Sequence, residues 1–332
     1  MNTISKVQKI GKNLLVAIAY GDSAGLAVET KTAQEIKKQY GSVDHLLDID
    51  NPYFDKSKAG TWSDDTQLSL AIANSLILSG EFNIDSIANE HVKALESTPL
   101  ITHNNEVIPR GWGKSTWQSV NRLKTKSHSP YNSGDKSRAG NGVLMKLAPL
   151  AFWQFLTFSS NDRNTIEILT RMTHDSDLAV VTSLVHRDVL VALIEDRIKS
   201  GEVIDFASSK AKYYEKQYPE AKNITSQSLA SLSKYKNINQ TVINKLAPKG
   251  GFFAPETLVL AYGVFNNNDK FSENIFEAVN FGGDTDSVAS IVGGMSVMLH
   301  GDIDMPSDID LLEDLDLLIQ TGQKLVDRAL TR

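Results

Sequence analysis

The sequence predicts an all-α fold in a single domain that covers residues 1–332. Apolar residues recur at helical spacing through most of the chain, as in Leu68, Ile72 and Leu76. The alternation of apolar and polar residues that is typical of half-buried strands is nearly absent, and no strand pattern is repeated. The length would allow one large domain or two ordinary ones, and the absence of a clear linker or internal repeat favours one.

The composition is that of an ordinary globular chain and excludes some kinds of site. Because the chain has no Cys, it contains no disulfide, no thiolate zinc site and no cysteine nucleophile. Its net charge of −6 argues against a broad nucleic-acid-binding face, although a local basic pocket is compatible with it. No stretch approaches the roughly 20 apolar residues that a membrane span requires, so we expect no membrane segment and a cytoplasmic location.

The first apolar segment resembles the core of a secretory signal peptide but is better interpreted as a helix. Two lysines precede the run Leu14–Ala19, which ends in a small-x-small pattern, yet Gly21 and Asp22 follow at once. We predict the first core helix over residues 11–29, broken or bent at its glycines and ending near Glu29.

The rest of the chain divides into helices and loops by the same rules. Residues 30–60 are polar and interrupted by Gly and Pro, so we expect a connecting region that could cover a site. The helix predicted over residues 65–79 is apolar on nearly all sides, which marks it as central. A loop with almost no apolar residue, expected to be a mobile surface linker, covers residues 124–141. Further helices are predicted over 83–98, after the turn 109–113, after residue 176, as two peripheral segments within 201–247, over 255–265 and over 311–330.

The most informative stretch is Gly-Gly-Asp-Thr-Asp-Ser, residues 282–287, which precedes an apolar run with helical spacing. Its oxygen donors Asp284, Asp286 and Ser287 would therefore lie at the start of a buried helix, where the glycines permit close approach of backbone to a ligand. Carboxylates are costly to bury unless something positive lies between them. Asp and Ser also favour helix starts as caps, so this stretch alone supports a cap and a metal site equally.

A second acidic stretch decides between these two interpretations. Ser63, Asp64 and Asp65 again gather oxygen donors before an apolar helix, and two adjacent carboxylates exceed what a cap requires. Two such clusters, far apart in the sequence, favour convergence on a shared cation. Hard oxygen ligands without Cys predict Mg2+ or Mn2+ rather than zinc, and four carboxylates could hold two ions roughly 3.5–4 Å apart.

Four other features are weaker on their own. Asp22 is interpreted as a hydrogen-bonded core carboxylate, and Glu29 as either a surface acid at a helix end or part of a site. The Gly-Asn-Gly turn of residues 140–142 precedes an apolar segment and could hold phosphates on its backbone N–H groups, although an ordinary turn is commoner. His174 lies at a predicted helix start, where it would either point into a pocket or act as a cap.

Together these stretches resemble one family in the order of its motifs. The chain is similar to the ADP-ribosylglycohydrolases, which include the dinitrogenase-reductase-activating glycohydrolases and the ADP-ribosylarginine and ADP-ribosylserine hydrolases. The resemblance covers nearly the whole chain, and the motifs that carry it are Gly21–Gly25 with Glu29, Trp62–Thr66, Arg110–Gly113, Gly140–Gly142 with Met145, Thr173-His174, and Gly282–Ser287. Each motif alone is weak to moderate, but six in the family's order are specific.

The resemblance implies a single orthogonal helical bundle with two Mg2+ ions, or Mn2+ in some members, in a central cleft. Carried over by position, the metal ligands are Ser63, Asp64 and Asp65 from one side and Asp284, Asp286 and Ser287 from the other. The residues expected to contact ADP-ribose are Gly113, Gly140, Asn141, Gly142 and His174. Asp65 or Glu29 is expected to be the catalytic proton acceptor or donor.

The chain departs from the family pattern at three of these positions. Ser63 and Ser287 stand where Thr is common, which keeps the hydroxyl. Lys146 stands where Arg is common, which keeps the charge but loses the bidentate fork. No metal-binding carboxylate is missing, so the resemblance implies an active hydrolase that releases ADP-ribose from an ADP-ribosylated protein, with arginine as the expected linkage.

Other functions are open at this point. A crystallin-like or ADP-ribose-binding protein without activity would share the fold, as would an immunity protein against an ADP-ribosylating toxin. A phosphoester hydrolase would use similar carboxylates, but the Gly-Asn-Gly turn has no obvious role there. Serine, thymidine and small-molecule linkages are alternatives to arginine. Tyr131 and Phe281 are the aromatic candidates for stacking on adenine.

Overall fold

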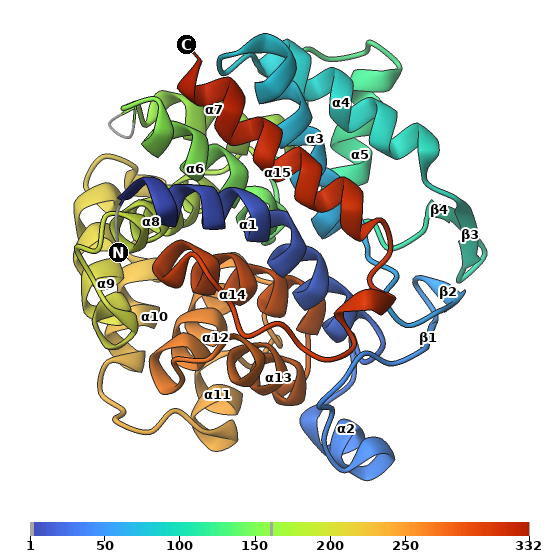
Figure 1. The fold of residues 1–332 in the computed structure, drawn as a ribbon, viewed down its shortest axis with the longest axis vertical. Coiled ribbons are helices and arrows are strands. Elements are labelled where there is room, and N and C mark those ends of the chain that lie inside the picture. Colours follow the sequence, from blue (N-terminus) through green and yellow to red (C-terminus); the bar gives the residue numbers. More distant parts are fainter. Residues whose placement is uncertain (1–2, 160–161, 332) are drawn as a thin grey trace.

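Helices make up almost all of the regular structure (Figure 1). The computed structural model describes residues 3–159 and 162–331, and the predicted all-α class is confirmed. The α-helices of these residues are α1 (Thr3–Leu26), α2 (Ala33–Tyr40), α3 (Asp64–Ser79), α4 (Ile84–Ser97), α5 (Lys114–Lys124), α6 (Ala148–Leu156), α7 (Asn164–Thr173), α8 (Asp177–Ile194), α9 (Val203–Glu215), α10 (Ile224–Leu232), α11 (Gln240–Leu246), α12 (Ala254–Asn267), α13 (Phe271–Phe281), α14 (Thr285–His300) and α15 (Leu315–Leu330).

Two short antiparallel hairpins supply the strands of the described residues, and the sequence pattern predicts neither of them. The strands are β1 (Ile49–Asn51) paired with β2 (Asp55–Ser57), and β3 (Leu100–His103) paired with β4 (Glu106–Pro109). Asn104 and Asn105 both have positive φ, 49° and 64°, which fits a two-residue type I′ turn. Both hairpins lie at the same edge of the molecule (Figure 1).

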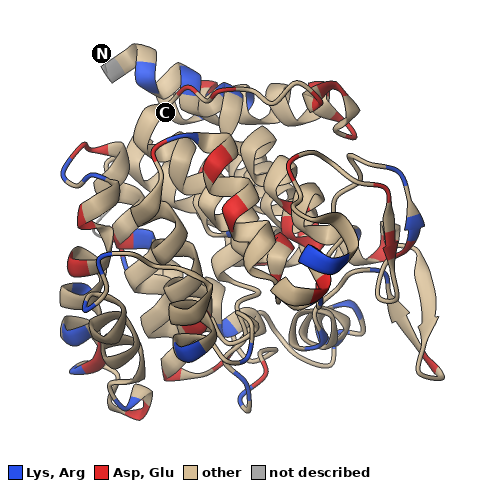
Figure 2. Ribbon diagram, turned by 90° about the horizontal axis from the view of Figure 1, so that it is seen from below, with Lys and Arg blue, Asp and Glu red and all other residues tan. Residues whose placement is uncertain are grey.

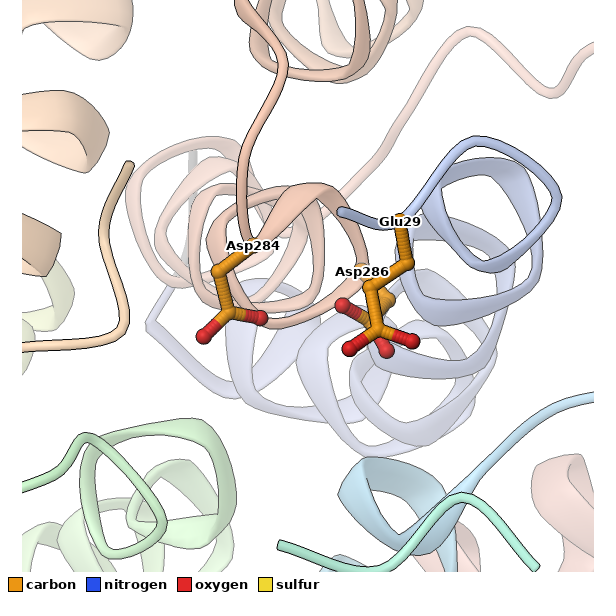
Figure 3. Close-up of side chains that lie close together, drawn as sticks. All are labelled: Glu29, Asp284 and Asp286. Atoms are coloured by element: carbon orange, nitrogen blue, oxygen red, sulfur yellow. The ribbon is translucent and has the colours of Figure 1, made fainter. Parts of the chain in front are cut away.

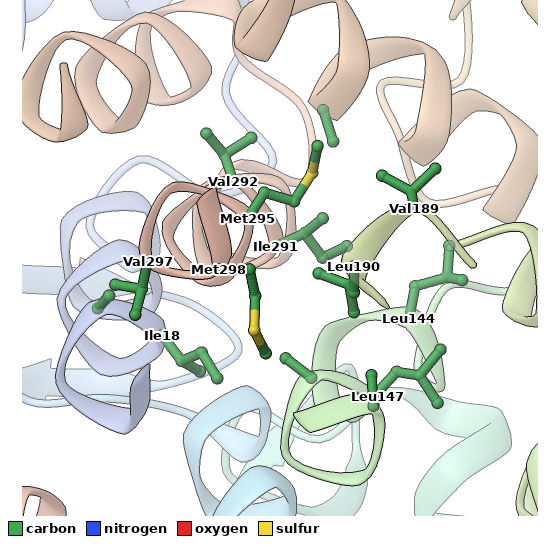
Figure 4. Packing of buried hydrophobic residues seen from close by; sticks show 14 of the residues in the cluster. Ile18, Leu144, Leu147, Val189, Leu190, Ile291, Val292, Met295, Val297 and Met298 are labelled. Carbon is green, nitrogen blue, oxygen red and sulfur yellow. The ribbon is translucent and has the colours of Figure 1, made fainter. Parts of the chain in front are cut away.

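The buried core forms around α14, which is enclosed by other helices. Helix α1 makes an extensive contact with α14, and α8, α12 and α13 also pack against it. Met295 and Met298 of α14 are fully buried, as is Leu190 of α8, and Figure 4 shows these side chains among their neighbours. Because α14 is held on several sides, the position of its N-terminus, which carries the acidic motif, is well defined.

Helix α1 is continuous from Thr3 to Leu26, so it is not broken at its glycines, and it starts and ends earlier than expected. Gly25 shows why glycine stands inside the helix: a Cβ atom there would lie 2.2 Å from the amide nitrogen of Asp286. The hydroxyl of Thr285 donates to the Gly25 carbonyl at 2.7 Å. Glycine within a helix costs about 1 kcal/mol relative to alanine, and this close contact with the start of α14 offsets the cost.

Replacing Gly25 with Ala is expected to lower the free energy of unfolding by about 2 kcal/mol, because the added methyl group overlaps backbone atoms of α14. The same overlap displaces the first turn of α14, so affinity for divalent cations should fall as well. Thermal denaturation and calorimetric titration with Mg2+ measure the two effects. Gly201→Ala is the matched control, since no atom lies within 4 Å of a Cβ at that position. Equal losses in the two variants would contradict the packing argument.

Several connecting segments contain more structure than the sequence predicts. Residues 30–60 hold α2 and the first hairpin, residues 201–247 hold three α-helices instead of two, and α13 is not predicted. Residues 124–141 do form a loop, but its second half is tied to the end of α7. Ser133 Oγ donates to the carbonyl of Met172 at 2.7 Å, and the amide of Asp135 donates to the carbonyl of Thr173 at 3.0 Å.

The surface carries charges of both signs. Figure 2 shows Lys and Arg interspersed with Asp and Glu over the part of the ribbon that the structure describes, which agrees with the net charge of −6. Among the described residues, every helix is too short or too polar to cross a membrane.

Candidate active site

The two acidic motifs lie at the N-termini of α3 and α14. Asp64 and Asp65 begin α3, and the N-cap Ser63 accepts a hydrogen bond from the amide of Asp65 at 3.3 Å. Asp284 is the N-cap residue of α14, and Asp286 lies in its first turn. Acids at these positions interact favourably with the helix dipole. A cap does not require burial, however, and all four acids are no more than 5% exposed.

Asp22 fixes the start of α3 and is the hydrogen-bonded core carboxylate expected from the sequence. It accepts hydrogen bonds from the amides of Ser63 and Thr66, both at 3.0 Å, and from the hydroxyl of Thr66 at 2.6 Å. Burial raises the pKa of Asp22 to about 6, and these hydrogen bonds oppose the shift. Asp22 therefore joins α1 to α3 and positions Asp64 and Asp65.

Gly283 brings the segment after α1 against the start of α14. Its carbonyl accepts a hydrogen bond from the amide of Thr30 at 2.8 Å, and the amide of the following residue, Asp284, donates to the carbonyl of Gly250 at 2.8 Å. The φ angle of Gly283 is 89°, and a Cβ atom there would lie 2.1 Å from the Gly250 oxygen, so only glycine fits. These contacts place Glu29, the neighbour of Thr30, beside the acids of α14.

Three carboxylates meet at this point (Figure 3). One carboxylate oxygen from each of Glu29, Asp284 and Asp286 lies within 4.8 Å of the others. Asp286 Oδ1 and Asp65 Oδ2 are buried without a hydrogen-bond partner among the described residues. Leaving such oxygens unpaired is costly, and a bound cation would supply the missing partner.

The pKa of every acid in this cluster is raised. Burial raises the pKa of Glu29 to about 8, and repulsion from Asp284 adds to it. Burial also raises the pKa of Asp64 to about 8 and holds the pKa values of Asp65 and Asp286 well above their usual range. Carboxylates gathered in this way require protons or a cation, and a set of hard oxygen donors suits a divalent metal ion. The acidic cluster could therefore bind a metal.

Lys146 is a buried positive charge on the α3 side of the cluster. It ends the 3-10 turn η1 (Leu144–Lys146) and is fully buried, and its ammonium has no hydrogen-bond partner among the described residues. Burial lowers the pKa of Lys146 to about 7, and the charges of Asp64 and Asp65 oppose the shift. Its charge therefore offsets part of the repulsion between these two acids.

The acids line a cavity of about 530 Å³, which is within the usual range for a small-molecule site. The acidic side chains that line it are Glu29, Asp64, Asp65, Asp284 and Asp286, and the hydroxyl residue Ser287 lines it as well. Ser287 lies near the α3 acids, with its hydroxyl 3.4 Å from Asp65 Oδ1. Ser63 is not among the lining residues; its hydroxyl accepts the cap hydrogen bond of α3 and keeps a second lone pair for a ligand.

The residues predicted to contact ADP-ribose line the same cavity: Gly113, Gly140, Asn141, Gly142 and His174. Asn141 Nδ2 donates to Asp284 Oδ2 at 2.7 Å, which joins the glycine-rich turn to the acidic cluster. The helix predicted after residue 176 is confirmed as α8, which Ser176 caps, and His174 lies just before it as the C-cap residue of α7. Burial lowers the pKa of His174 to about 3, so its ring is neutral at physiological pH.

Sequence reasoning missed three basic residues of the cavity, Lys114, Arg138 and Lys249. Lys249 opens the stretch Lys-Gly-Gly-Phe-Phe, residues 249–253, and this stretch was a usable signal: a glycine pair flanked by a cation and two aromatic residues. Three cations that face a glycine-rich turn suit the phosphates of a nucleotide. The cavity therefore combines an acidic wall with a basic one.

The aromatic residues of the cavity also differ from the two candidates of the sequence. Tyr131 is 62% exposed, and neither it nor Phe281 lines the cavity. Phe252 and Phe253 do line it, and the ammonium of Lys249 lies 4.4 Å from the centroid of the Phe253 ring. An aromatic base could stack on one of these rings.

The acids of this cavity could hold a divalent cation, and its basic side chains could hold the phosphates of a nucleotide. The fold and the site thus fit an all-α enzyme for a phosphate-bearing substrate. The family model of the ADP-ribosylglycohydrolases matches residues 6–332, and the chain belongs to this family. Its relatives are hydrolases that act on ADP-ribosylated targets, and this chain is an enzyme of that kind.

Comparisons with individual proteins agree with this assignment. The chain is 24% identical over 322 residues to an ADP-ribosylarginine hydrolase of Pseudomonas putida, which covers 96% of this chain and 78% of the relative. It is 24% identical over 292 residues to the ADP-ribosyl-(dinitrogen reductase) glycohydrolase of Rhodospirillum rubrum, and the match covers 88% of this chain and 86% of the relative. A solved structure described as an ADP-ribosylglycohydrolase-related protein complex has the same fold, with a TM-score of 0.71 at 21% identity, covering 98% of this chain and 99% of the other.

Proposed function

We propose that this chain is a Mg2+-dependent hydrolase that cleaves the bond between ADP-ribose and an arginine side chain of a modified protein, releasing ADP-ribose. The observation that carries the proposal is the meeting of Glu29, Asp284 and Asp286 within 4.8 Å, in a cavity that basic residues also line. Arginine is proposed as the linkage because a relative that matches 96% of the chain is named an ADP-ribosylarginine hydrolase.

Two Mg2+ ions are proposed because the acids come from two helix starts, and Mn2+ could replace them. The side chains proposed to bind the ions are Ser63, Asp64, Asp65, Asp284, Asp286 and Ser287. Glu29 lies close enough to the α14 acids to bind an ion with them. The bound cations would polarise the ribose oxygens and a water molecule and would stabilise negative charge.

The chain's own residues would bind the substrate and move the protons. Lys114, Arg138 and Lys249 neutralise the diphosphate, and the backbone of residues 140–142 lies along it. Hydrolysis at the anomeric carbon builds oxocarbenium-like charge, which nearby carboxylates stabilise. We assign the proton acceptor, which deprotonates the attacking water, and the donor to the leaving nitrogen to Asp65 or Glu29.

A panel of linkages tests this function. Matched peptides ADP-ribosylated on arginine or on serine are incubated with the protein and Mg2+, and released ADP-ribose is quantified by mass spectrometry. We expect release from the arginine peptide at a rate at least about tenfold above that from the serine peptide. Faster release from serine would refute the proposed linkage, and no release from any substrate would refute the proposed activity.

Asp65→Asn separates the two candidates for proton transfer. If Asp65 is the base, this variant loses about 10²- to 10⁴-fold in kcat at saturating Mg2+ while substrate still binds. Glu29→Gln is measured beside it. Full turnover by Asp65→Asn would exclude Asp65 and assign the role to Glu29. Single-turnover kinetics report the chemical step directly in both variants.

A further inference from the structure

A second cavity, of about 630 Å³, adjoins the candidate active site. The two cavities share lining residues at their boundary, among them Glu29, Gly113 and Phe252. Glu29 belongs to the acidic trio, so the second cavity opens next to the place where the reacting carbon of the substrate would lie. The two cavities therefore form one continuous cleft with the acidic cluster in the middle.

The outer wall of the second cavity is built by the two hairpins. The amide of Gly111 donates to the carbonyl of Tyr53 at 2.8 Å, which ties the turn between β1 and β2 to the segment after β4. The rings of Tyr53 and His103 stack, with centroids 4.2 Å apart and planes inclined by 36°. Trp112 closes the base of the wall, and its indole nitrogen donates to Gln67 Oε1 at 2.9 Å. The wall is thus aromatic and held by hydrogen bonds to the α3 region.

The charge of the second cavity is opposite to that of the diphosphate side of the first. Glu106, at the start of β4, lines it and forms no ion pair among the described residues. Glu29 also lines it, and Lys114 is its one Lys or Arg lining residue among those described. By contrast, Arg138 and Lys249 line only the first cavity. A diphosphate is therefore drawn to one side and a cation to the other.

We propose that the second cavity binds the leaving group, with the guanidinium of the modified arginine against the Tyr53 and His103 rings and paired with Glu106. A planar guanidinium stacks on aromatic faces and forms bidentate hydrogen bonds with carboxylates, and this wall offers both. The assignment rests on the proposed function for its substrate. It adds the residues that select arginine over an uncharged linkage.

Two variants and two controls test the assignment. Glu106→Gln removes the charge, and Tyr53→Leu removes the ring. Val107→Ala is the control for the hairpin, since Val107 is exposed and points away from the cavity that its neighbours line. Glu220→Gln is the control for charge at an exposed position outside the cleft. Each protein is titrated calorimetrically with free ADP-ribose in Mg2+ and by NMR with agmatine, a decarboxylated arginine. KM and kcat are measured on the ADP-ribosylarginine peptide.

We expect Glu106→Gln and Tyr53→Leu each to raise KM, and to weaken agmatine binding, by about tenfold, with kcat changed by less than about threefold. The affinity for free ADP-ribose should be that of the wild type, and both controls should match the wild type throughout. Unchanged agmatine binding in both variants would overturn the proposal. It would also be overturned if the affinity for free ADP-ribose fell by the same factor by which KM rises, because the variants would then act on the ADP-ribose side of the cleft. If the wild type does not release ADP-ribose, the proposed function fails, while agmatine binding that depends on Glu106 would still support the guanidinium site.

Discussion

Asp284→Asn is expected to reduce the rate of ADP-ribose release by at least about a hundredfold at saturating Mg2+. Asp284 belongs to the acidic trio and also accepts a hydrogen bond from Asn141, so its loss removes a cation contact and frees the glycine-rich turn. Asn has the same shape as Asp, and the N-terminus of α14 should keep its structure. Steady-state assays over a range of Mg2+ concentrations measure the effect.

The same loss is expected for Asp64→Asn, because Asp64 approaches the cavity from α3 and not from α14. Asp316→Asn is the control, since this acid is exposed in the first turn of α15 and so changes net charge alone. Calorimetry with Mn2+ shows whether each variant has lost a cation. Asp284→Asn and Asp64→Asn with full activity and unchanged Mn2+ binding would contradict the two-sided metal site.

The second large effect is on the dependence of thermal stability on pH and Mg2+. In the folded protein without metal, burial raises the pKa of both Glu29 and Asp64 to about 8, whereas the unfolded chain releases these protons near about pH 4. Between about pH 4 and about pH 8 the folded state holds more protons on Glu29 and Asp64 than the unfolded chain does. The stabilisation from these two carboxyls is therefore complete below about pH 4 and is lost as the pH rises through about 8. A divalent cation replaces the protons on these carboxyls, so the stabilisation of the folded protein by the cation must grow between about pH 4 and about pH 8.

We therefore expect the increase in Tm on adding saturating Mg2+ to be small at about pH 5 and to reach about 5 °C or more at about pH 8.5. The buried His174 and His186, whose pKa values are lowered to about 3, make the protein more stable as the pH rises, with or without Mg2+. The difference between Tm with and without Mg2+ removes this contribution, so it is the quantity to compare between pH values. Differential scanning calorimetry after EDTA treatment measures it. Asp284→Asn should show a smaller increase. A Mg2+ effect that is independent of pH would contradict the raised pKa values.

The acidic site could be predicted from local sequence because each half of it is local. Asp64 and Asp65 precede one apolar helix, Asp284 and Asp286 precede another, and the cost of burying carboxylates favours their meeting around a cation. The interpretation of Asp22 as a core carboxylate could be made for the same reason. The helix predicted over residues 65–79 agrees within one position with α3, whereas α1, which carries Asp22, begins eight residues before its predicted start.

Other parts of the structure depend on contacts that no local pattern contains. The glycines of α1 predicted an interruption, but Gly25 is required by the backbone of α14, which is distant in the sequence. Lys249 and Phe252 belong to a recognisable local pattern, but it takes a long-range contact, the hydrogen bond that Gly250 accepts from Asp284, to bring that pattern to the cavity. The hairpins are short, so period-2 alternation could not reveal them. The side of the cleft assigned to the leaving group was therefore not predictable.

The most direct measurement is release of free ADP-ribose from an ADP-ribosylarginine protein by the EDTA-treated enzyme, before and after Mg2+ is restored. The account predicts no release without metal, full release with Mg2+ or Mn2+, and no recovery in Asp64→Asn or Asp284→Asn. Release that is equally fast in EDTA would contradict the metal-dependent site at the start of α3 and α14. Binding of ADP-ribose without release, in the presence of either metal, would contradict the proposed hydrolysis of the arginine linkage.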